Sequence, residues 1–404
     1  MRSDVNGSSG RWRALALLSV VLVLSMTTWF SASAVVPQLR AEWDLSSSAS
    51  AWLTIAVQLG FVAGAIVSSV FNVADLVAPR HVILSGASGA AAVNAALVVS
   101  DGAAAAIPLR LATGFFLAGV YPPALKLLAT WFTKDRGVAL GVLVGALTVG
   151  TAGPHLVNAL GGLDWRFVVY VTSGLTLAGG LIAEFAVADG PFRFPPAVFA
   201  PSQAGRVFAN RGVRLASLGY FGHMWELYAM WAWFLVFFSA AAGSAGPRAA
   251  PSFATFAVIA IGGAGCCVGG VLGDRWGRTK TTAAMMGASA ACAILIGPLA
   301  TWGPVAVLAV GLVWGFSVVA DSAQFSTMVT ELADQAYVGT ALTLQIALGF
   351  TLSVATIWLV PVLESIVGWR WTFAFLAPGP IVGTIAMLRL RASPEAARIA
   401  GGRA

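Results

Sequence analysis

The stretch GVLGDRWGRTK (Gly270–Lys280) is short and charged, and a long apolar segment lies on each side of it. No Asp, Glu, Lys or Arg occurs from Pro251 to Val271, and none occurs from Thr281 to Val319. A compact group of charges between two such segments is typical of a tight connection between membrane helices, held at the membrane surface. This stretch therefore predicts a membrane protein built from helices.

The composition of the whole chain supports this interpretation. The 404 residues are 58% hydrophobic and only 10% charged, and the mean hydropathy is +0.86. Soluble domains carry about 25% charged residues, so a soluble protein is excluded. The net charge of +7 comes from basic residues that stand singly between apolar segments, which gives no nucleic-acid-binding surface. We therefore expect a lipid bilayer, and no nucleic acid, as the surroundings of this chain.

A membrane-spanning helix needs about 20 mostly apolar residues, and the chain contains twelve such segments. The first segment, after Arg2, Arg11 and Arg13, is too long for a signal peptide, whose apolar region has about 7–15 residues. We expect it to be retained as a span. The predicted spans are 13–36, 49–71, 81–100, 103–128, 137–160, 165–188, 211–240, 250–273, 279–299, 303–329, 336–363 and 369–389.

The chain divides at the proline-containing segment 189–210. We predict an N-terminal six-helix bundle (1–188), a cytoplasmic linker (189–210) and a C-terminal six-helix bundle (211–404). Basic residues of short loops collect on the cytoplasmic side of a membrane. With both termini placed inside, only Arg40, Arg166, Arg248 and Arg370 fall outside, so we expect both termini to be cytoplasmic.

The two halves resemble each other at matching positions. Trp165-Arg166 opens span six as Trp369-Arg370 opens span twelve, and Gly114 in span four corresponds to Gly315 in span ten. The predicted fold is therefore all-α and integral to the membrane, with 12 transmembrane helices in two pseudo-symmetric six-helix bundles. Parallel repeats of this kind place a binding site at their interface, near the midplane of the membrane.

Taken together, these features resemble the major facilitator superfamily over essentially the whole chain. The charged turn is similar to that family's signature between helices eight and nine, through Gly270, Asp274, Arg275, Gly277 and Arg278. Its first-half counterpart is reduced to Asp75 and Arg80, and Arg110-x-x-x-Gly114 is similar to the family's second motif. The resemblance implies that these charged turns act as a conformational gate. A carboxylate such as Asp274 can lie against the positive N-terminus of a neighbouring helix, in span five or span eleven.

A third motif, which the family's drug/proton antiporters carry in span five, is met only in part. Gly141, Gly145, Gly150, Gly153 and Pro154 are present, but the Gly-Pro pair falls one residue early and the trailing glycines are missing. The partial motif favours export, and its gaps favour uptake, so the direction stays open.

Ionisable side chains inside spans are costly and indicate function, and Arg110, His223, Glu226 and Asp321 are the candidates. At about 1.5 Å per residue, His223 and Glu226 lie roughly 12 and 16 Å into the membrane from Leu215. His223, Glu226 and Trp233 share one face of span seven, whereas Asp321 and Gln324 share one face of span ten. We expect both faces to line a central cavity.

The resemblance and these residues predict a proton-coupled secondary active transporter of a small organic solute, working by alternating access in a bacterial inner membrane. Glu226 and His223 are the expected proton carriers, and Arg110, Asp321, Trp233 and Gln324 complete the expected binding site. We expect a monomer with no cofactor, no metal and no enzymatic activity, because no catalytic motif is present. A transporter-like sensor, a lipid flippase and an organic-anion uptake porter stay open as alternatives.

Overall fold

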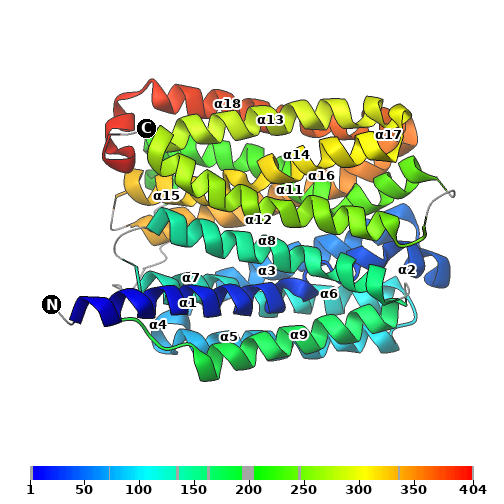
Figure 1. Ribbon diagram of the computed structural model, residues 1–404, viewed down its shortest axis with the longest axis horizontal. Coiled ribbons are helices and arrows are strands. Elements are labelled where there is room, and N and C mark those ends of the chain that lie inside the picture. Colours follow the sequence, from blue (N-terminus) through cyan, green and yellow to red (C-terminus); the bar gives the residue numbers. More distant parts are fainter. Residues whose placement is uncertain are drawn as a thin grey trace.

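The structure is a computed structural model that describes residues 3–71, 73–132, 136–161, 164–192, 204–243, 247–334 and 337–402. Within these ranges the regular structure is helical, with no strand, and the long helices lie roughly side by side (Figure 1). Twelve helices of the described residues are long and apolar enough to cross a membrane. The chain is thus a multi-pass, all-α membrane protein, as the sequence predicts.

The N-terminal half occupies the lower part of Figure 1. Its helices are α1 (Ser3–Ser25), α2 (Val36–Trp43), α3 (Ser47–Val70), α4 (Val73–Leu76), α5 (Pro79–Ala95), α6 (Ala103–Leu117), α7 (Tyr121–Ala129), α8 (Arg136–Leu160) and α9 (Trp165–Ala186).

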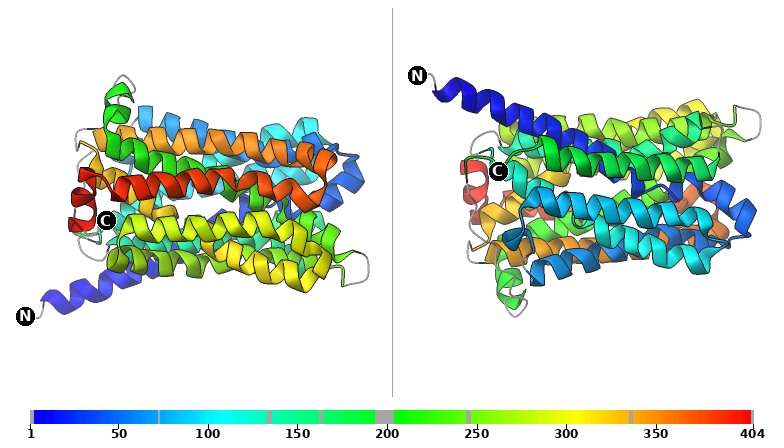
Figure 2. Two further views of the ribbon diagram at one scale, coloured as in Figure 1. Left: turned by 90° about the horizontal axis from the view of Figure 1, so that it is seen from above. Right: turned by 90° about the horizontal axis from the view of Figure 1, so that it is seen from below.

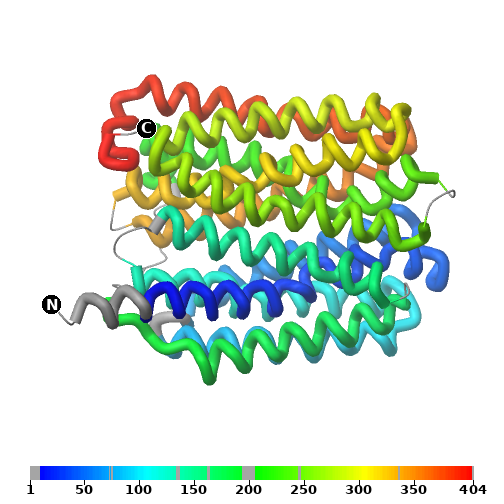
Figure 3. Tube along the Cα trace, in the orientation of Figure 1, coloured from blue at the N-terminus to red at the C-terminus, as the bar shows by residue number. Residues whose placement is uncertain are grey.

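The C-terminal half occupies the upper part, and Figure 3 follows the chain through both halves in the same orientation. Its helices are α10 (Ala204–Ala209), α11 (Arg211–Ala242), α12 (Ala250–Trp276), α13 (Arg278–Leu299), α14 (Pro304–Ala320), α15 (Ser322–Leu332), α16 (Val338–Val367), α17 (Trp369–Thr372) and α18 (Pro378–Arg391). The predicted domain bounds stay a prediction, because 193–203 of the expected linker lie outside the described residues.

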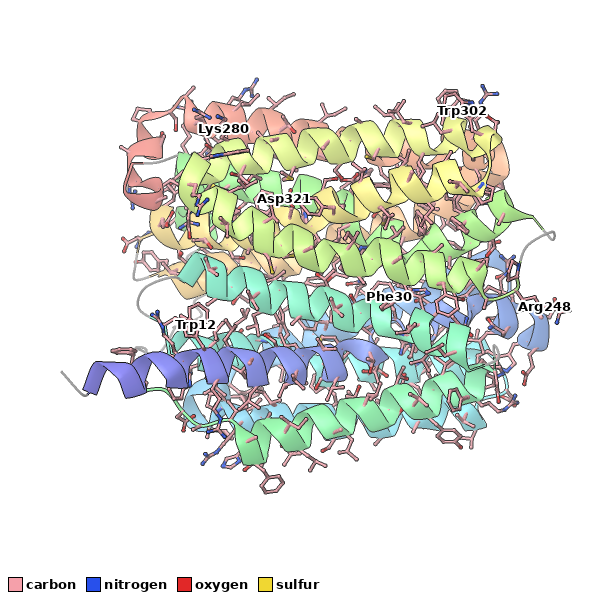
Figure 4. The ribbon with its side chains drawn as sticks, in the orientation of Figure 1. Trp12, Phe30, Arg248, Lys280, Trp302 and Asp321 are labelled. Carbon is pink, nitrogen blue, oxygen red and sulfur yellow. The ribbon has the colours of Figure 1, made fainter. Side chains whose placement is uncertain are left out.

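Both described ends of the chain lie at one end of the helices, which we call the terminal side; the opposite end is the far side (Figure 2). Figure 4 places Trp12 and Lys280 on the terminal side, and Arg248 and Trp302 on the far side. The predicted orientation assigns the terminal side to the cytoplasm.

Several predicted spans are interrupted, and three of the interruptions bear on the site. Span one, predicted as 13–36, leaves regular α-helix after Ser25 and continues as a short 3-10 turn, Met26–Thr28, before α2 begins at Val36. Span four divides into α6 and α7, where Pro122 and Pro123 cannot donate backbone hydrogen bonds to the preceding turn. Span ten divides into α14 and α15 at Asp321.

The two halves repeat one close helix contact, as their sequence similarity predicts. A Cβ atom on Gly114 of α6 would lie 2.0 Å from the Val57 carbonyl oxygen of α3. A Cβ atom on Gly315 of α14 would lie 1.7 Å from the Val258 carbonyl oxygen of α12. Only glycine fits at either position, so spans two and four, and spans eight and ten, cross with their backbones in contact.

A second line of small residues joins the halves along α8 and α12. A Cβ atom on Gly141 or on Gly145 would lie 2.8 Å from a carbonyl oxygen of α12, and Gly270 packs on Gly137 near the terminal side. On the far side, Asn158 donates a hydrogen bond of 3.0 Å to Ser252. We call this contact the glycine seam; it runs from one side of the molecule to the other.

Candidate functional site

A cavity of about 460 Å³ lies between the two halves. Its residues come from α3, α7, α8, α11, α14, α15 and α16, together with Trp29 after the end of α1 and Ala118 between α6 and α7. Ser69, Lys126 and Gly339, at the terminal-side ends of α3, α7 and α16, belong to its wall. The cavity therefore reaches the terminal side, and its volume is that of a typical site for a small organic molecule.

Aromatic rings close the cavity towards the far side. Trp29 stacks on Tyr228 with ring centroids 6.0 Å apart, and Phe61 packs against Phe350 at 5.0 Å. Phe30, just beyond Trp29, packs against Tyr228 at 6.3 Å and lies nearer the far side than Asp321 does (Figure 4). Because these pairs join a ring of the N-terminal half to a ring of the C-terminal half, we call them the aromatic seal.

The α3–α16 contact differs from the glycine seam. α3 and α16 meet at the Phe61–Phe350 pair, and on its terminal side Ala65, Ser69 and Thr343 all face the cavity. The two helices are therefore separated by the cavity over their terminal-side parts. The molecule is closed along α8 and α12 and hollow between the terminal-side parts of α3 and α16.

His223 and Asp321 form a buried pair beside this cavity. Nδ1 of His223 lies 2.9 Å from Oδ1 of Asp321, and neither side chain is more than 2% exposed. His223 belongs to the cavity wall, whereas Asp321 lies behind it at the junction of α14 and α15. The Tyr220 and Phe325 rings pack on the imidazole at 6.1 and 5.6 Å. This arrangement offers one proton-binding group to the cavity and holds it from behind with a carboxylate.

Glu226 does not face the cavity, contrary to our expectation. It accepts hydrogen bonds of 2.7 Å from the Ser289 hydroxyl of α13 and the Trp314 indole N–H of α14. Its contacts therefore lie within the C-terminal half. Trp233 is also turned away, because its indole N–H donates to the Ile357 carbonyl oxygen at 2.9 Å. The face of α11 that lines the cavity carries Tyr220, His223, Met224, Leu227, Tyr228 and Trp231.

Arg110 is fully buried and lies outside the cavity wall, in the N-terminal half. Its guanidinium donates to the carbonyl oxygens of Leu53, Thr28 and Trp29, with Nε at 3.2 Å from Leu53 and Nη1 at 2.9 Å from Thr28. Nη1 also lies 3.1 Å from the side-chain oxygens of Ser31 and Asn94. Span one leaves regular α-helix after Ser25, so the carbonyl oxygens of Thr28 and Trp29 do not belong to a regular α-helix. Backbone groups inside a membrane need such a partner, and Arg110 supplies it.

The charged turn ties four helices together near the terminal side. Gly277 has a φ of +99°, which glycine adopts without strain, and it separates α12 from α13. Arg278 donates to Glu331 from Nη2 at 3.1 Å and to Gln324 from Nη1 at 3.0 Å, so Gln324 belongs to this network and lies outside the cavity wall.

Asp274 of the same turn reaches the N-terminal half. A Cβ atom on Gly137 would lie 2.7 Å from Oδ2 of Asp274, which places the carboxylate at the first turn of α8, the predicted span five. Arg275 is exposed, and Nη1 of Arg278 lies 3.5 Å from Oδ1 of Asp274. An anion at the start of a helix is favourable, so this contact can hold the terminal ends of α8 and α12 together.

The counterpart of the charged turn in the N-terminal half, Asp75 and Arg80, has fewer described contacts. Arg80 stands in the first turn of α5, and its Nε is buried without a hydrogen-bond partner among the described residues. Asp75 belongs to α4, but its side chain lies outside the described part of the chain.

Sequence reasoning missed most of the cavity wall. Its polar and aromatic residues are mainly Trp, Tyr, Phe, Ser and Thr, and few of its side chains are charged. The chain has only five tyrosines, and three of them, Tyr121, Tyr220 and Tyr228, line this cavity. Tyrosines of membrane helices usually collect at the two membrane surfaces. Tyrosines that lie well inside predicted spans were therefore the sequence feature that could have identified the cavity wall.

A cavity between two matched helical halves, open on one side and closed by aromatic rings on the other, is the arrangement found in membrane transporters that are built from parallel repeats. The sequence profile of the Major Facilitator Superfamily matches residues 18–357, and the chain belongs to that family.

Individual relatives agree with this membership. A puromycin resistance protein of Streptomyces alboniger is 27% identical over 174 residues, which are 41% of this chain and 34% of the relative. An MFS-type transporter of Penicillium expansum is 29% identical over 97 residues, which are 22% of this chain and 19% of that relative. The matched part is thus about a third or less of these relatives. The solved structure of a D323A mutant of the nucleoside transporter NupG shares the fold, with a TM-score of 0.68 at 14% identity over 93% of this chain and 99% of that one.

Proposed function

We propose that this protein is a secondary active transporter that moves a small organic solute across a bacterial inner membrane in exchange for protons. The observation that carries the proposal is the His223–Asp321 pair at the wall of a cavity that is open on one side only. In the predicted orientation that side is cytoplasmic, both termini are inside, and the protein acts as a monomer.

The pair has the properties that proton coupling needs. Burial makes a lone charge costly, so a proton arriving on His223 while Asp321 is ionised creates a pair of opposite charges, and its departure removes one of them. The neighbouring ionisable groups are Glu226 and Cys266, both within electrostatic range of Asp321, and Lys126, on the wall of the same cavity. Because His223 faces the cavity and Asp321 does not, solute binding can alter the proton affinity of the imidazole directly.

Export is the direction we propose. The partial antiporter motif in span five favours it, and so does the likeness to a puromycin resistance protein. Glu226, which the sequence suggested as a proton carrier, is assigned instead to holding α11 against α13 and α14, because both of its hydrogen-bond donors, Ser289 and Trp314, belong to those helices.

The test uses purified protein in liposomes that contain a pH-sensitive dye, with puromycin and then the compounds of a thermal-shift screen as solutes. With an acidic lumen, an antiporter accumulates solute while the lumen becomes more alkaline. Accumulation driven only by an alkaline lumen would instead show symport. Solute binding without any flux would favour the sensor alternative.

Two matched carboxylate variants locate the coupling site. Asp321→Asn is expected to abolish solute-dependent proton movement, whereas Glu226→Gln is expected to retain it in a less stable protein. If Asp321→Asn moved protons with solute at the parent ratio, the pair would not be the coupling site.

A further inference from the structure

The closed end of the cavity is lined by aromatic rings. Flat rings of Trp29, Phe61, Tyr228, Trp231 and Phe350 meet there, and their centroids lie between 4.9 and 6.0 Å from those of their neighbours. All five belong to the cavity wall. Aromatic rings bind other planar rings by offset or edge-to-face contact, worth about 0.5–1.5 kcal/mol per pair beyond the area buried.

Polar atoms without partners stand beside these rings. No hydrogen bond joins the hydroxyls of Tyr121, Tyr220 or Tyr228 to any other described residue, and the three phenols lie within electrostatic range of one another. Nε2 of His223 is buried and likewise has no partner within the described part of the chain. A buried polar atom is normally hydrogen-bonded, and the three tyrosines belong to the cavity wall, so one buried nitrogen and three unpaired hydroxyls on this wall indicate a ligand with several hydrogen-bonding groups.

The charge on the wall argues for an uncharged ligand. No carboxylate is among the described residues that line the cavity, and its only ionisable groups besides the phenols are His223 and Lys126. Lys126 lies in the last turn of α7, at the terminal side. His223 is paired with the carboxylate of Asp321, which lies behind the cavity wall. An anion at the aromatic end would be removed from water without a counter-charge, which is costly in a membrane interior. A cation would gain attraction to the ring faces, but the described residues of the wall offer no carboxylate to balance it.

From these observations we infer that the solute is an uncharged planar aromatic or heteroaromatic molecule that carries several hydrogen-bonding groups. Its ring lies against the aromatic seal, and its polar groups bind the tyrosine hydroxyls and Nε2 of His223. The inference rests on the proposed function, since it names the class of solute that the transporter carries.

Binding to the purified protein, measured without any pH gradient, tests the class. The panel consists of aromatic scaffolds, each in uncharged, cationic and anionic form and with a non-aromatic counterpart. The indole set contains N-acetyltryptophanamide, tryptamine, N-acetyltryptophan and N-acetylleucinamide. We expect the tightest binders of the panel to be uncharged aromatic compounds, with Kd at least about tenfold below their charged and non-aromatic counterparts. Equal binding of charged or non-aromatic members, or no binding by any member, would overturn the inference.

Tyrosine variants that keep the ring locate the site. Tyr220→Phe and Tyr121→Phe are expected to weaken the best binder about two- to tenfold, the effect of one hydrogen bond of about 0.5–1.5 kcal/mol. The thermal stability of the empty protein should not change. Tyr170→Phe is the matched control, because Tyr170 is 58% exposed on α9, away from the cavity. Unchanged affinity in both cavity variants would place the ligand elsewhere.

The two proposals fail in different ways. Tight binding of uncharged aromatic compounds without proton-coupled flux would leave the solute class standing and remove the transport mechanism. Proton-driven flux of charged or non-aromatic solutes would leave the transport mechanism standing and remove the proposed solute class.

Discussion

Replacing Arg110 by methionine should destabilise the protein, because Arg110 supports the interruption of span one. The variant keeps a long side chain but loses the donors to the carbonyl oxygens of Thr28, Trp29 and Leu53. Thr28 still accepts from the Ser31 hydroxyl, and Leu53, inside α3, keeps its helical backbone partner. The Trp29 carbonyl oxygen is therefore the acceptor that loses its donor, at a cost of roughly 1–3 kcal/mol. Removal of a buried charge offsets part of this cost, and we expect a net loss of about 1–2 kcal/mol.

Reversible unfolding in mixed micelles, titrated with SDS and followed by tryptophan fluorescence, measures this loss. Arg80→Met is the matched control, since Nε of Arg80 has no partner among the described residues, and it should change stability by less than about 1 kcal/mol. A stable Arg110→Met variant that had lost only transport would refute the reasoning. It would show that Arg110 serves proton or solute movement and not the support of the interrupted helix.

Three further predictions follow from the contacts between helices and from the far side. Asp274→Asn should weaken the contact at the start of α8 by about 0.3–1 kcal/mol and so shift the equilibrium between the two access states about two- to fivefold. Distances between spin labels on the terminal side measure this shift, and an unchanged distance distribution would contradict the prediction. Gly145→Leu should slow turnover, because even a Cβ atom at this position would lie 2.8 Å from a carbonyl oxygen of α12. Gly174→Leu should be tolerated, because a Cβ atom at Gly174 would have no neighbouring atom within 4 Å. Equal turnover in the two variants would count against close packing along the glycine seam. The hydrogen bond from Arg166 lowers the pKa of Glu42, so Glu42 contributes stability above the usual glutamate pKa of about 4.3 and loses it as the pH falls through the lowered value. Glu42→Gln should therefore lower the melting temperature at neutral pH and have no effect in acid, and a pH-independent effect would exclude this pair as the cause.

The membrane spans could be predicted because they depend on local composition. Hydropathy placed eleven of the twelve within four residues at each end, whereas span one, predicted to residue 36, ends at Thr28. The similarity of Gly114 to Gly315 correctly indicated equivalent helix crossings. Gly263, Gly265 and Gly269 of α12 also serve close helix packing, since a Cβ atom at each would lie within 3.0 Å of a neighbouring helix.

The interruption of span one could not be predicted, because its cause is not local. The residues from Ala14 to Phe30 include neither glycine nor proline. The chain leaves regular α-helix there with the support of Arg110, which is more than 80 residues away in sequence. An isolated segment carries no sign of a partner that only the fold supplies.

Helical periodicity identified polar faces but not what each face contacts. Glu226 and Asp321 were expected at the cavity because buried polar groups indicate function. Polar groups within membranes also bond neighbouring helices of the same bundle, and Glu226 does so with Ser289 and Trp314. The sequence gives no means of distinguishing these two uses, since the partners lie on other helices. His223 is the candidate for which the expected cavity position agrees with the structure.

The glycine seam also determines where the molecule can swing. At Gly141, Gly145 and Gly263 the backbones of α8 and α12 approach each other where the glycines have no side chain, so these two helices can rotate against each other about this line of contact. The opposite edge, at α3 and α16, then makes the large excursion. A covalent cross-link between the terminal-side ends of α3 and α16 would arrest the transport cycle, whereas one midway along α8 and α12, near Gly145 and Gly263, would leave it running.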